Sequence, residues 1–220
     1  MCAHSAAVAC HCDVHAITDV DTELPIPSLQ YETTERRLML WTLEACLRYI
    51  ESDDFDRDTI MLDVDQLIYG DLSHVFNRKA DLSVLVRATA KHMEQDGGQP
   101  LLNGVQFWRA KAKKRLIPFY QQALDIARTL PEDRIVWGAD TDAVRRLIEP
   151  IELGNVARAG LHLEMVDAER VIETFSDRHA EALAEGRSPW PARPVLDFRW
   201  MRKPNMPAVY RATFAQGAVA

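Results

Sequence analysis

The pattern of apolar and polar positions is clearest in residues 32–52. Leu40, Leu43, Leu47 and Ile50 follow one another at intervals of three or four residues, a spacing that places side chains on one face of a helix. This stretch therefore predicts an amphipathic helix. Further helices are predicted at residues 3–12, 117–130 (with Pro118 in the first turn), 141–148 and 177–185. Short apolar runs predict strands at residues 14–18, 59–62, 82–87, 104–108, 135–137 and 195–198, and residues 91–100 are predicted to form a polar loop.

The first predicted elements alternate in the order helix, strand, helix, strand. This order favours an α/β fold with helical crossovers, and we expect a mixed, mostly parallel sheet flanked by helices. A chain of 220 residues is long enough for one domain with a large core and short for two, so residues 1–220 are expected to form a single domain. Ligands of such sheets bind at the carboxyl ends of strands. Asp19, Asp63 and Asp65 are predicted to lie at such ends.

The composition is that of an ordinary globular protein, with 47% hydrophobic and 27% charged residues, and it excludes wholesale disorder. The net charge of −7 argues against a broad nucleic-acid-binding face, so no nucleic-acid partner is expected. No apolar run approaches the roughly 20 residues of a membrane-spanning helix, and the first residues do not resemble a signal peptide. We therefore expect no transmembrane segment, a cytoplasmic location and free thiols at the four cysteines.

Cysteine and histidine side chains crowd the beginning of the chain, at Cys2, His4, Cys10, His11, Cys12 and His15. Their C-x-C spacing lacks the C-x₂₋₄-C geometry of a zinc knuckle, and no second pair follows at a suitable distance. We therefore expect no zinc site here.

Two acidic residues follow the apolar strand in the stretch TIMLDVDQLIYGDL, residues 59–72. Asp63 and Asp65 are separated by one valine, so in an extended strand their side chains would point to the same face. Two adjacent carboxylates raise the free-energy cost of each other's ionisation unless a cation lies between them. A hard divalent ion such as Mg²⁺ or Mn²⁺ would meet this need. The ordinary alternative is a solvated strand end that leads into a turn.

Four segments, in order along the chain, carry a resemblance to a known family. TIMLDVDQLIYGDLSHVF contains an apolar strand, D-x-D, an apolar pair, D-L and an aromatic residue. LLNGVQFWR is similar to an N-[AST]-G-V strand, WGADTDAV to a D-Q segment, and VLDFRWMRKPNM to a C-terminal H-F-x-G-x-x-K-P segment. Together they resemble nucleotide-sugar glycosyltransferases of the GT-A fold, particularly the glycogenin and lipopolysaccharide galactosyltransferase group. The resemblance covers most of the chain from about Cys12 onward.

The resemblance implies a metal-dependent enzyme that moves a hexose from a nucleotide-diphosphate sugar, with UDP-hexose as the expected donor, to an unknown acceptor. It implies that Asp63, Asp65 and Asp197 hold Mn²⁺ or Mg²⁺, which would offset the charge on the departing diphosphate. Lys203 would supply a second positive charge to the phosphates. The implied donor-binding residues are Asp19, Asp63, Asp65, Asn103, Gly104 and Lys203, and the implied catalytic residues are Asp140 and Asn103.

Ordinary structural roles stay open for several of these residues. Lys203 could be a solvated surface lysine, and Asn103 and Gly104 could form a turn before a strand. Asp140 could be the N-cap of the helix that follows it.

Three residues depart from the family's pattern, and so does the start of the chain. Asp197 stands where the family has a metal-binding histidine, and an aspartate can bind a hard cation through oxygen. Thr141 stands in place of a glutamine, and Trp200 in place of a glycine near the phosphates. The resemblance begins inside the family's first helix, so we expect the first strand to be lacking and the activity to be weakened. Residues 186–220 are expected to close over the donor site.

Two other functions stay open. A glycosyltransferase-like module could bind a nucleotide, a sugar or a protein partner without turnover. A haloacid-dehalogenase-type phosphohydrolase also has D-x-D after an apolar strand, and residues 138–142 resemble its late acidic motif, although Gln66 and Leu67 replace the residues expected after D-x-D. The sequence also leaves a homo-oligomer open.

Overall fold

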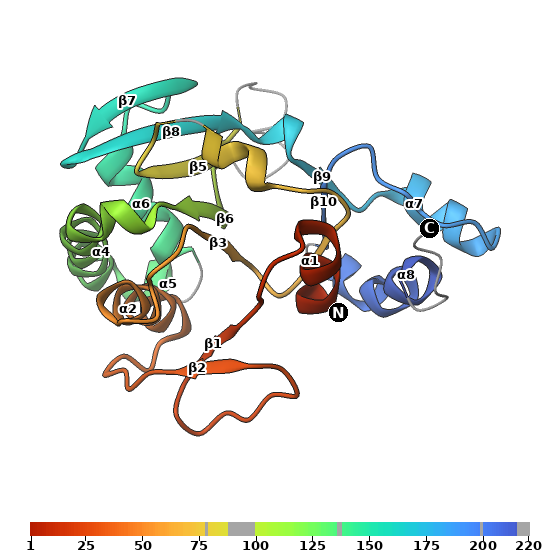
Figure 1. Ribbon diagram of the computed structural model, residues 1–220, viewed down its shortest axis with the longest axis horizontal. Coiled ribbons are helices and arrows are strands. Elements are labelled where there is room, and N and C mark those ends of the chain that lie inside the picture. Colours follow the sequence, from red (N-terminus) through yellow and green to blue (C-terminus); the bar gives the residue numbers. More distant parts are fainter. Residues whose placement is uncertain (78, 88–99, 136–137, 199, 215–220) are drawn as a thin grey trace. The chain divides into compact units, whose positions relative to one another are not determined.

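The computed structural model describes residues 1–77, 79–87, 100–135, 138–198 and 200–214. They form two compact units (Figure 1). Unit 1 consists of Met1–Val14, Leu62–His74 and the described part of Glu169–Ala220. Unit 2 consists of His15–Met61 and of the described part of Val75–Ala168. The predicted single domain, with residues 186–220 closing over a donor site, stays a prediction.

Unit 2 is built on a five-stranded sheet in the order β3-β6-β5-β8-β7. β5 pairs with β8 in parallel and with β6 antiparallel, and β7 pairs with β8 antiparallel. Every residue of β5 is buried, because this strand has a neighbour on each side and side chains packed on both faces. The strands are β3 (Thr59–Leu62, whose last residue belongs to unit 1), β5 (Leu82–Val86), β6 (Leu101–Trp108), β7 (Gly154–Arg158) and β8 (Leu161–Asp167).

Three helices lie together beside this sheet, α2 (Leu38–Glu51), α4 (Lys113–Arg128) and α6 (Ala139–Ile148) (Figure 1). The buried residues of α4 recur every three or four positions, so one face of the helix is apolar. This face packs with Leu82, Val84 and Val86 of β5 in the core of unit 2. The remaining elements of unit 2 are β1 (Ala16–Thr18) and β2 (Ser28–Gln30), which form a separate parallel pair, α5 (Glu132–Ile135), and the 3₁₀ turns η1 (Ser73–Asn77, shared with unit 1) and η2 (Ala110–Ala112).

Unit 1 contains a three-stranded sheet in the order β4-β10-β9. Its strands are β4 (Gln66–Ile68), β9 (Ile172–Thr174) and β10 (Val195–Asp197), and the central β10 pairs antiparallel with β4 and parallel with β9. Helix α1 (Cys2–Cys10) lies against β4, where Ser5 Oγ accepts a hydrogen bond from Ile68 N–H at 3.0 Å. The other elements are the 3₁₀ turns η3 (Ala168–Arg170) and η4 (Trp200–Asn205) and the helices α7 (Asp177–Ala184) and α8 (Met206–Thr213). The core consists of Leu67, Phe175, Leu196, Phe198, Met206 and Val209.

The predicted mixed α/β class, with sheets flanked by helices, is confirmed. Each of the two larger sheets combines parallel and antiparallel pairs. The strand predicted at residues 59–62 is found with the same bounds as β3. Helices and strands also occur at the other predicted places, with the exceptions given in the next two paragraphs. The described residues include no helix that is both long and apolar enough to cross a membrane.

Two helix starts differ from the prediction. α2 begins at Leu38 and not at residue 32, because the buried Glu44 carboxylate accepts hydrogen bonds from the backbone N–H groups of Thr34 and Glu35 at 2.8 Å and holds them in a loop. α4 begins at Lys113, directly after η2, so Pro118 lies in its second turn and not in its first.

Residues 135–137 were expected to form a strand, but Ile135 ends helix α5. Residues 136 and 137 lie outside the described residues, as do residues 91–99 of the predicted polar loop. Four short strands, β2, β4, β7 and β9, and helix α8 were not predicted. Three of these strands contain only three residues, which is too short for a periodic pattern.

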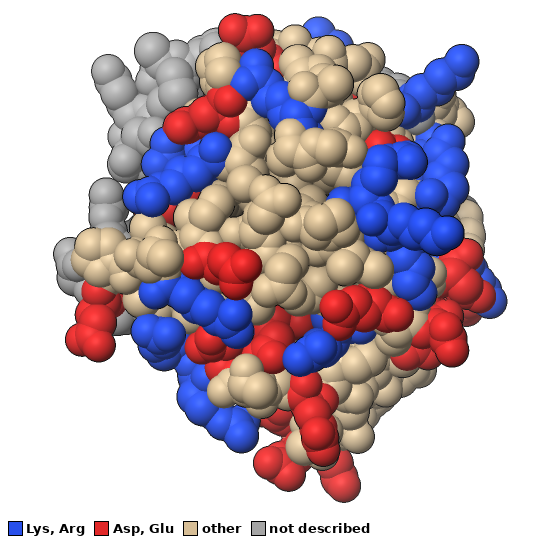
Figure 2. All heavy atoms as spheres, turned by 90° about the vertical axis from the view of Figure 1, so that its left-hand side faces the viewer, with Lys and Arg blue, Asp and Glu red and all other residues tan. Residues whose placement is uncertain are grey.

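Figure 2 shows one face of the molecule, on which Lys and Arg side chains lie next to Asp and Glu side chains over much of the surface. Ion pairs between such side chains occur in unit 2. Arg128 Nε lies 2.9 Å from Glu35 Oε1, and Arg48 Nη1 lies 3.1 Å from Glu51 Oε2. The two signs of charge are therefore interspersed on this face.

Candidate functional site

The D-x-D motif lies in the turn between β3 and β4, in unit 1. β3 ends at Leu62, and Asp63, Val64 and Asp65 connect it to Gln66, the first residue of β4. The prediction that both acids share one face of a strand is therefore wrong, because strand alternation stops at Leu62. Asp63 is exposed, as is Val64, whereas Asp65 is half-buried. The turn thus gives the two carboxylates different environments.

Asp65 contacts the C-terminal part of unit 1 through its backbone and its side chain. Its carbonyl oxygen accepts a hydrogen bond from Phe198 N–H at 3.0 Å. Its Oδ2 lies 2.7 Å from Nζ of Lys203, which belongs to η4. Lys203 is therefore ion-paired and not only solvated. The fold brings the D-x-D turn and the K-P segment together, although they are far apart in the sequence.

Asp197 lies on β10, beside the start of β4. In the antiparallel ladder it stands opposite Gln66, so the two side chains point to the same face of the sheet. Only 4% of Asp197 and 2% of Gln66 are exposed. Gln66 Oε1 is buried, and the described residues provide no hydrogen bond to it. A buried oxygen beside a buried aspartate favours a cation or a polar hydrogen at this place.

The thiol of Cys2 lies close to the two acids of the D-x-D motif. Its Sγ donates a weak hydrogen bond to the carbonyl oxygen of Asp63 at 3.5 Å. Burial raises the pKa of Cys2 to about 11, and the charges of Asp63 and Asp65 act in the same direction. The thiol is therefore protonated near neutral pH.

The donor atoms in this region suit a hard cation in kind. Carboxylate and amide oxygens are the ligands that Mg²⁺ and Mn²⁺ prefer, and the ammonium of Lys203 already stands beside Asp65 as a cation. Within the described ranges, however, no group of three or more His, Cys, Asp and Glu side chains is arranged to hold a metal ion. Mg²⁺ is commonly bound by one or two carboxylates together with water and substrate phosphates.

Asn103 and Asp140, the predicted catalytic pair, are joined directly in unit 2. Asn103 Nδ2 donates a hydrogen bond to Asp140 Oδ2 at 2.8 Å. Asp140 lies in the first turn of α6, whose N-cap is Gly138 with φ 86°, so the open alternative of an Asp140 N-cap does not hold. Burial raises the pKa of Asp140 in spite of the hydrogen bonds donated by Asn103 and Thr141. The pair is therefore a fixed carboxylate–amide contact.

Asn103 and Gly104 occupy an irregular part of β6. Leu102 and Gln106 pair with two consecutive residues of β5, so residues 103–105 form a bulge between them. A turn before the strand had been the open alternative for these residues, but β6 already begins at Leu101. The bulge frees Asn103 from the regular ladder and lets its side chain reach α6.

Gln106 supports this pair and was not predicted as a site residue. Its Nε2 donates to Asn103 Oδ1 at 2.6 Å, and its Oε1 accepts from Trp108 Nε1 at 3.0 Å and from the Tyr120 hydroxyl. Gln106 is only 1% exposed. Because a buried amide needs all these partners, Gln106 fixes the orientation of Asn103. A glutamine inside the apolar run GVQFW was the signal that could have indicated this role.

Asp19, the remaining predicted donor-binding residue, follows β1 in unit 2. Its Oδ1 accepts a hydrogen bond from Asp21 N–H at 3.2 Å, as in turns that an aspartate stabilises. β1 pairs with β2 and is not part of the five-stranded sheet. The predicted residues thus fall into two groups, Asp63, Asp65, Asp197 and Lys203 in unit 1 and Asp19, Asn103, Gly104 and Asp140 in unit 2.

A cavity of about 880 Å³ in unit 2 is lined by Val86, Arg87, Pro100 and residues 149–153. None of these residues belongs to the groups described above. The cavity therefore adds no support to the predicted site.

Comparisons with known proteins bear on the fold. No family model matches the chain, and neither does any curated protein. Among solved structures, the chain is similar to the crystal structure of a glycosyltransferase involved in the glycosylation of the major capsid of PBCV-1. The similarity covers 85% of this chain and 82% of that chain, with a TM-score of 0.52 and 10% sequence identity.

The chain has a glycosyltransferase-like fold. This likeness concerns the backbone. The chemistry of the chain depends on its own side chains.

Proposed function

We propose that the protein is a metal-dependent glycosyltransferase that moves a hexose from a nucleotide-diphosphate sugar, with UDP-hexose as the predicted donor, to an acceptor. The Asp65–Lys203 ion pair carries this proposal. In a chain with a glycosyltransferase-like fold, a carboxylate of the D-x-D motif and the lysine of the K-P segment lie 2.7 Å apart. One group suits a metal ion and the other suits a phosphate, so the two charges that a metal–diphosphate complex needs are neighbours.

Asp63, Asp65 and Asp197 would hold Mn²⁺ or Mg²⁺ through carboxylate oxygens, and the buried Gln66 Oε1 is a further oxygen near Asp197. When bound, the ion would offset the negative charge that develops on the departing diphosphate. Lys203 would leave Asp65 and donate to the phosphate oxygens, while Asp65 would turn to the metal ion. The Lys203 ammonium would then exchange Asp65 for a phosphate, and the Asp65 carboxylate would exchange Lys203 for the metal ion. Neither charged group would therefore be left without an opposite charge in a half-buried place.

Asp140 and Asn103 are proposed to contact the sugar, with Asp19 and Gly104 as further donor-binding residues. Asn103 Nδ2 holds the Asp140 carboxylate in one orientation, and the buried Gln106 holds Asn103 in turn. A fixed carboxylate of this kind can accept a hydrogen bond from a sugar hydroxyl or stabilise positive charge at the anomeric carbon. The narrower likeness to the glycogenin and lipopolysaccharide galactosyltransferase group rests on the sequence motifs alone.

A module that binds a nucleotide, a sugar or a protein partner without turnover is the second candidate. The Asp65–Lys203 ion pair is also compatible with such a module, because Lys203 would then permanently occupy the place of a metal ion beside Asp65. The similarity of the fold to that of a glycosyltransferase disfavours a haloacid-dehalogenase-type phosphohydrolase.

Thermal unfolding with a panel of nucleotide sugars, with and without Mn²⁺, tests the proposal. A ligand present at 100 times its Kd stabilises the folded state by about 2.7 kcal/mol, which corresponds to a rise in Tm of about 5–10 °C for a chain of this size. We expect this rise for one donor class only when Mn²⁺ is present. It should be lost in Asp65→Asn and retained in the matched control Asp53→Asn, an exposed acid in unit 2.

Release of the nucleotide diphosphate over a long incubation separates the enzyme from the binding module. Metal-dependent donor consumption supports the transferase. Donor binding without any consumption supports the module. A panel without any metal-dependent shift contradicts the metal-dependent transferase, whereas a shift that does not require Mn²⁺ supports the module in which Lys203 replaces the metal ion.

A further inference from the structure

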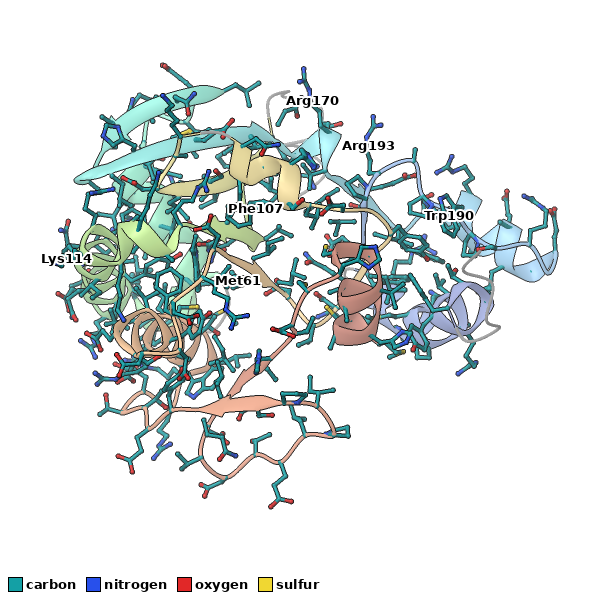
Figure 3. All side chains as sticks on the ribbon, viewed as in Figure 1. Met61, Phe107, Lys114, Arg170, Trp190 and Arg193 are labelled. Atoms are coloured by element: carbon teal, nitrogen blue, oxygen red, sulfur yellow. The ribbon has the colours of Figure 1, made fainter. Side chains whose placement is uncertain are left out.

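Trp190 is an exposed aromatic side chain on a rigid segment of unit 1. It is 61% exposed, whereas its neighbours Pro189 and Pro191 are both buried. Its backbone N–H donates to the Ser188 carbonyl oxygen at 2.9 Å. Because each proline fixes its own φ and restricts the residue before it, the segment has little freedom, and the indole is held outward between two anchored residues (Figure 3).

The indole of Trp190 rests on a second aromatic ring. Tyr69, which follows β4, meets it edge to face with ring centroids 5.1 Å apart and an interplanar angle of 80°. The Tyr69 hydroxyl lies 3.3 Å from Thr213 Oγ1, and that oxygen lies 3.2 Å from Ser188 Oγ. The phenol ring of Tyr69 is also 5.2 Å from the ring of Phe214. Three separate segments of unit 1 therefore support the position of the exposed ring.

Polar groups of both signs lie close to Trp190 in the sequence. Arg187 is ion-paired with Glu185, and Ala192 N–H donates to Glu173 Oε2 at 2.6 Å. Arg193 is exposed and lies near the start of β10 (Figure 3). The segment that carries Trp190 thus combines one exposed apolar ring with hydrogen-bond donors and acceptors at neighbouring positions.

The exposed apolar surface at Trp190 is small, which limits the kind of partner that can bind there. A stable protein interface buries about 800 Å² on each partner and involves about 20–30 residues. Besides Trp190, the large apolar side chains of unit 1 that are described as exposed are Met1 and Val64. One exposed ring in a segment with polar groups suits a ligand that has an apolar face of about one ring and hydroxyl groups around it. A pyranose has this shape and chemistry.

We propose that Trp190 is a stacking platform for a pyranose ring of a saccharide, and that this saccharide is the acceptor. The identification of the saccharide as an acceptor rests on the proposed function, whereas saccharide binding at Trp190 does not. The indole supplies a flat apolar surface that is fixed before binding, so little conformational entropy is lost when a sugar ring stacks on it. The hydroxyls and charged groups around the indole supply hydrogen bonds to the sugar hydroxyls.

Titration of the protein with linear oligosaccharides of glucose, galactose and mannose, by calorimetry or saturation-transfer NMR, tests this proposal. We expect at least one saccharide to bind the wild type, Trp190→Ala to weaken it about tenfold or more, and Trp190→Phe to weaken it less than about threefold because a ring is retained. Leu24→Ala removes an exposed apolar side chain of unit 2 and should bind as the wild type does. Trp190→Ala should melt within about 2 °C of the wild type, since the side chain is mostly exposed.

Two outcomes overturn the saccharide platform: no oligosaccharide binds the wild type, or Trp190→Ala binds as tightly as the wild type. Donor hydrolysis in the absence of acceptor is measured separately and should be the same in Trp190→Ala and wild type. If the donor is not consumed but saccharide binding depends on Trp190, the transferase fails and the platform stands. If the donor is consumed and Trp190→Ala leaves the KM for the bound oligosaccharide unchanged, that saccharide is not the acceptor and the transferase stands.

Discussion

Replacing Lys203 by methionine would separate the role of this lysine in ligand binding from its role in stability. Methionine keeps an unbranched apolar side chain and removes the ammonium group. The ion pair with Asp65 is partly open to solvent, with 48% of the lysine and 21% of the aspartate side chain exposed. Loss of such a pair should change the free energy of unfolding by less than about 1 kcal/mol. For a chain of this size, that is a change in Tm of no more than about 4 °C.

The effect of this substitution on ligand binding should be much larger. A hydrogen bond to a charged group contributes about 1.5–3 kcal/mol, which corresponds to an increase in Kd of about 10- to 150-fold. Calorimetric titration with UDP in the presence of Mn²⁺ measures this change. Binding of Mn²⁺ alone should change in the opposite direction and become tighter, because the ammonium no longer competes for Asp65.

Lys114→Met is the matched control for this experiment. Lys114 is an exposed lysine on α4 of unit 2 (Figure 3), and its loss should leave the Kd for UDP unchanged. If Lys203→Met binds UDP and Mn²⁺ as the wild type does, Lys203 neither binds the diphosphate nor competes with Mn²⁺ for Asp65. Its pair with Asp65 is then an ordinary surface ion pair.

Two further substitutions test the carboxylate–amide group in unit 2. Because burial raises the pKa of Asp140 above 3.8, its protonated form stabilises the fold at low pH, and this stability is lost as the pH rises through the raised pKa. Urea unfolding between pH 3.5 and 7 should therefore show that the wild type loses stability relative to Asp140→Asn as the pH rises, and parallel curves would contradict this. Gln106→Leu should lower the free energy of unfolding by about 2–4 kcal/mol, because Trp108 Nε1 and the Tyr120 hydroxyl lose their buried acceptor. Gln121→Leu, at an exposed position of α4, should change the free energy of unfolding by less than about 0.5 kcal/mol, and an equal effect of both glutamine substitutions would show that burial is not the cause.

Local patterns in the sequence located the longer elements well. The apolar stripe of α2 and the apolar run of β3 depend only on the period of a helix and of a strand, so they could be predicted from neighbouring residues. The start of α2 could not be predicted in this way. It is set by Glu44, a residue of the helix whose carboxylate accepts hydrogen bonds from the loop before the helix. The three-residue strand β4 also escaped prediction, since its place depends on pairing with β10.

The sequence by itself determined which residues could carry chemistry: the acids of D-x-D, the asparagine of N-G-V, the aspartate of the following segment and the lysine of K-P. Only the tertiary structure decided which of them meet. It formed the ion pair between Asp65 and Lys203 and the hydrogen bond between Asn103 and Asp140. It also brought Gln106, which was not predicted, into hydrogen-bond contact with Asn103. The physical reason is that a motif is set by residues next to each other in the chain. A hydrogen bond or an ion pair is set by distances of about 3 Å between segments that only the packing of sheets and helices brings together.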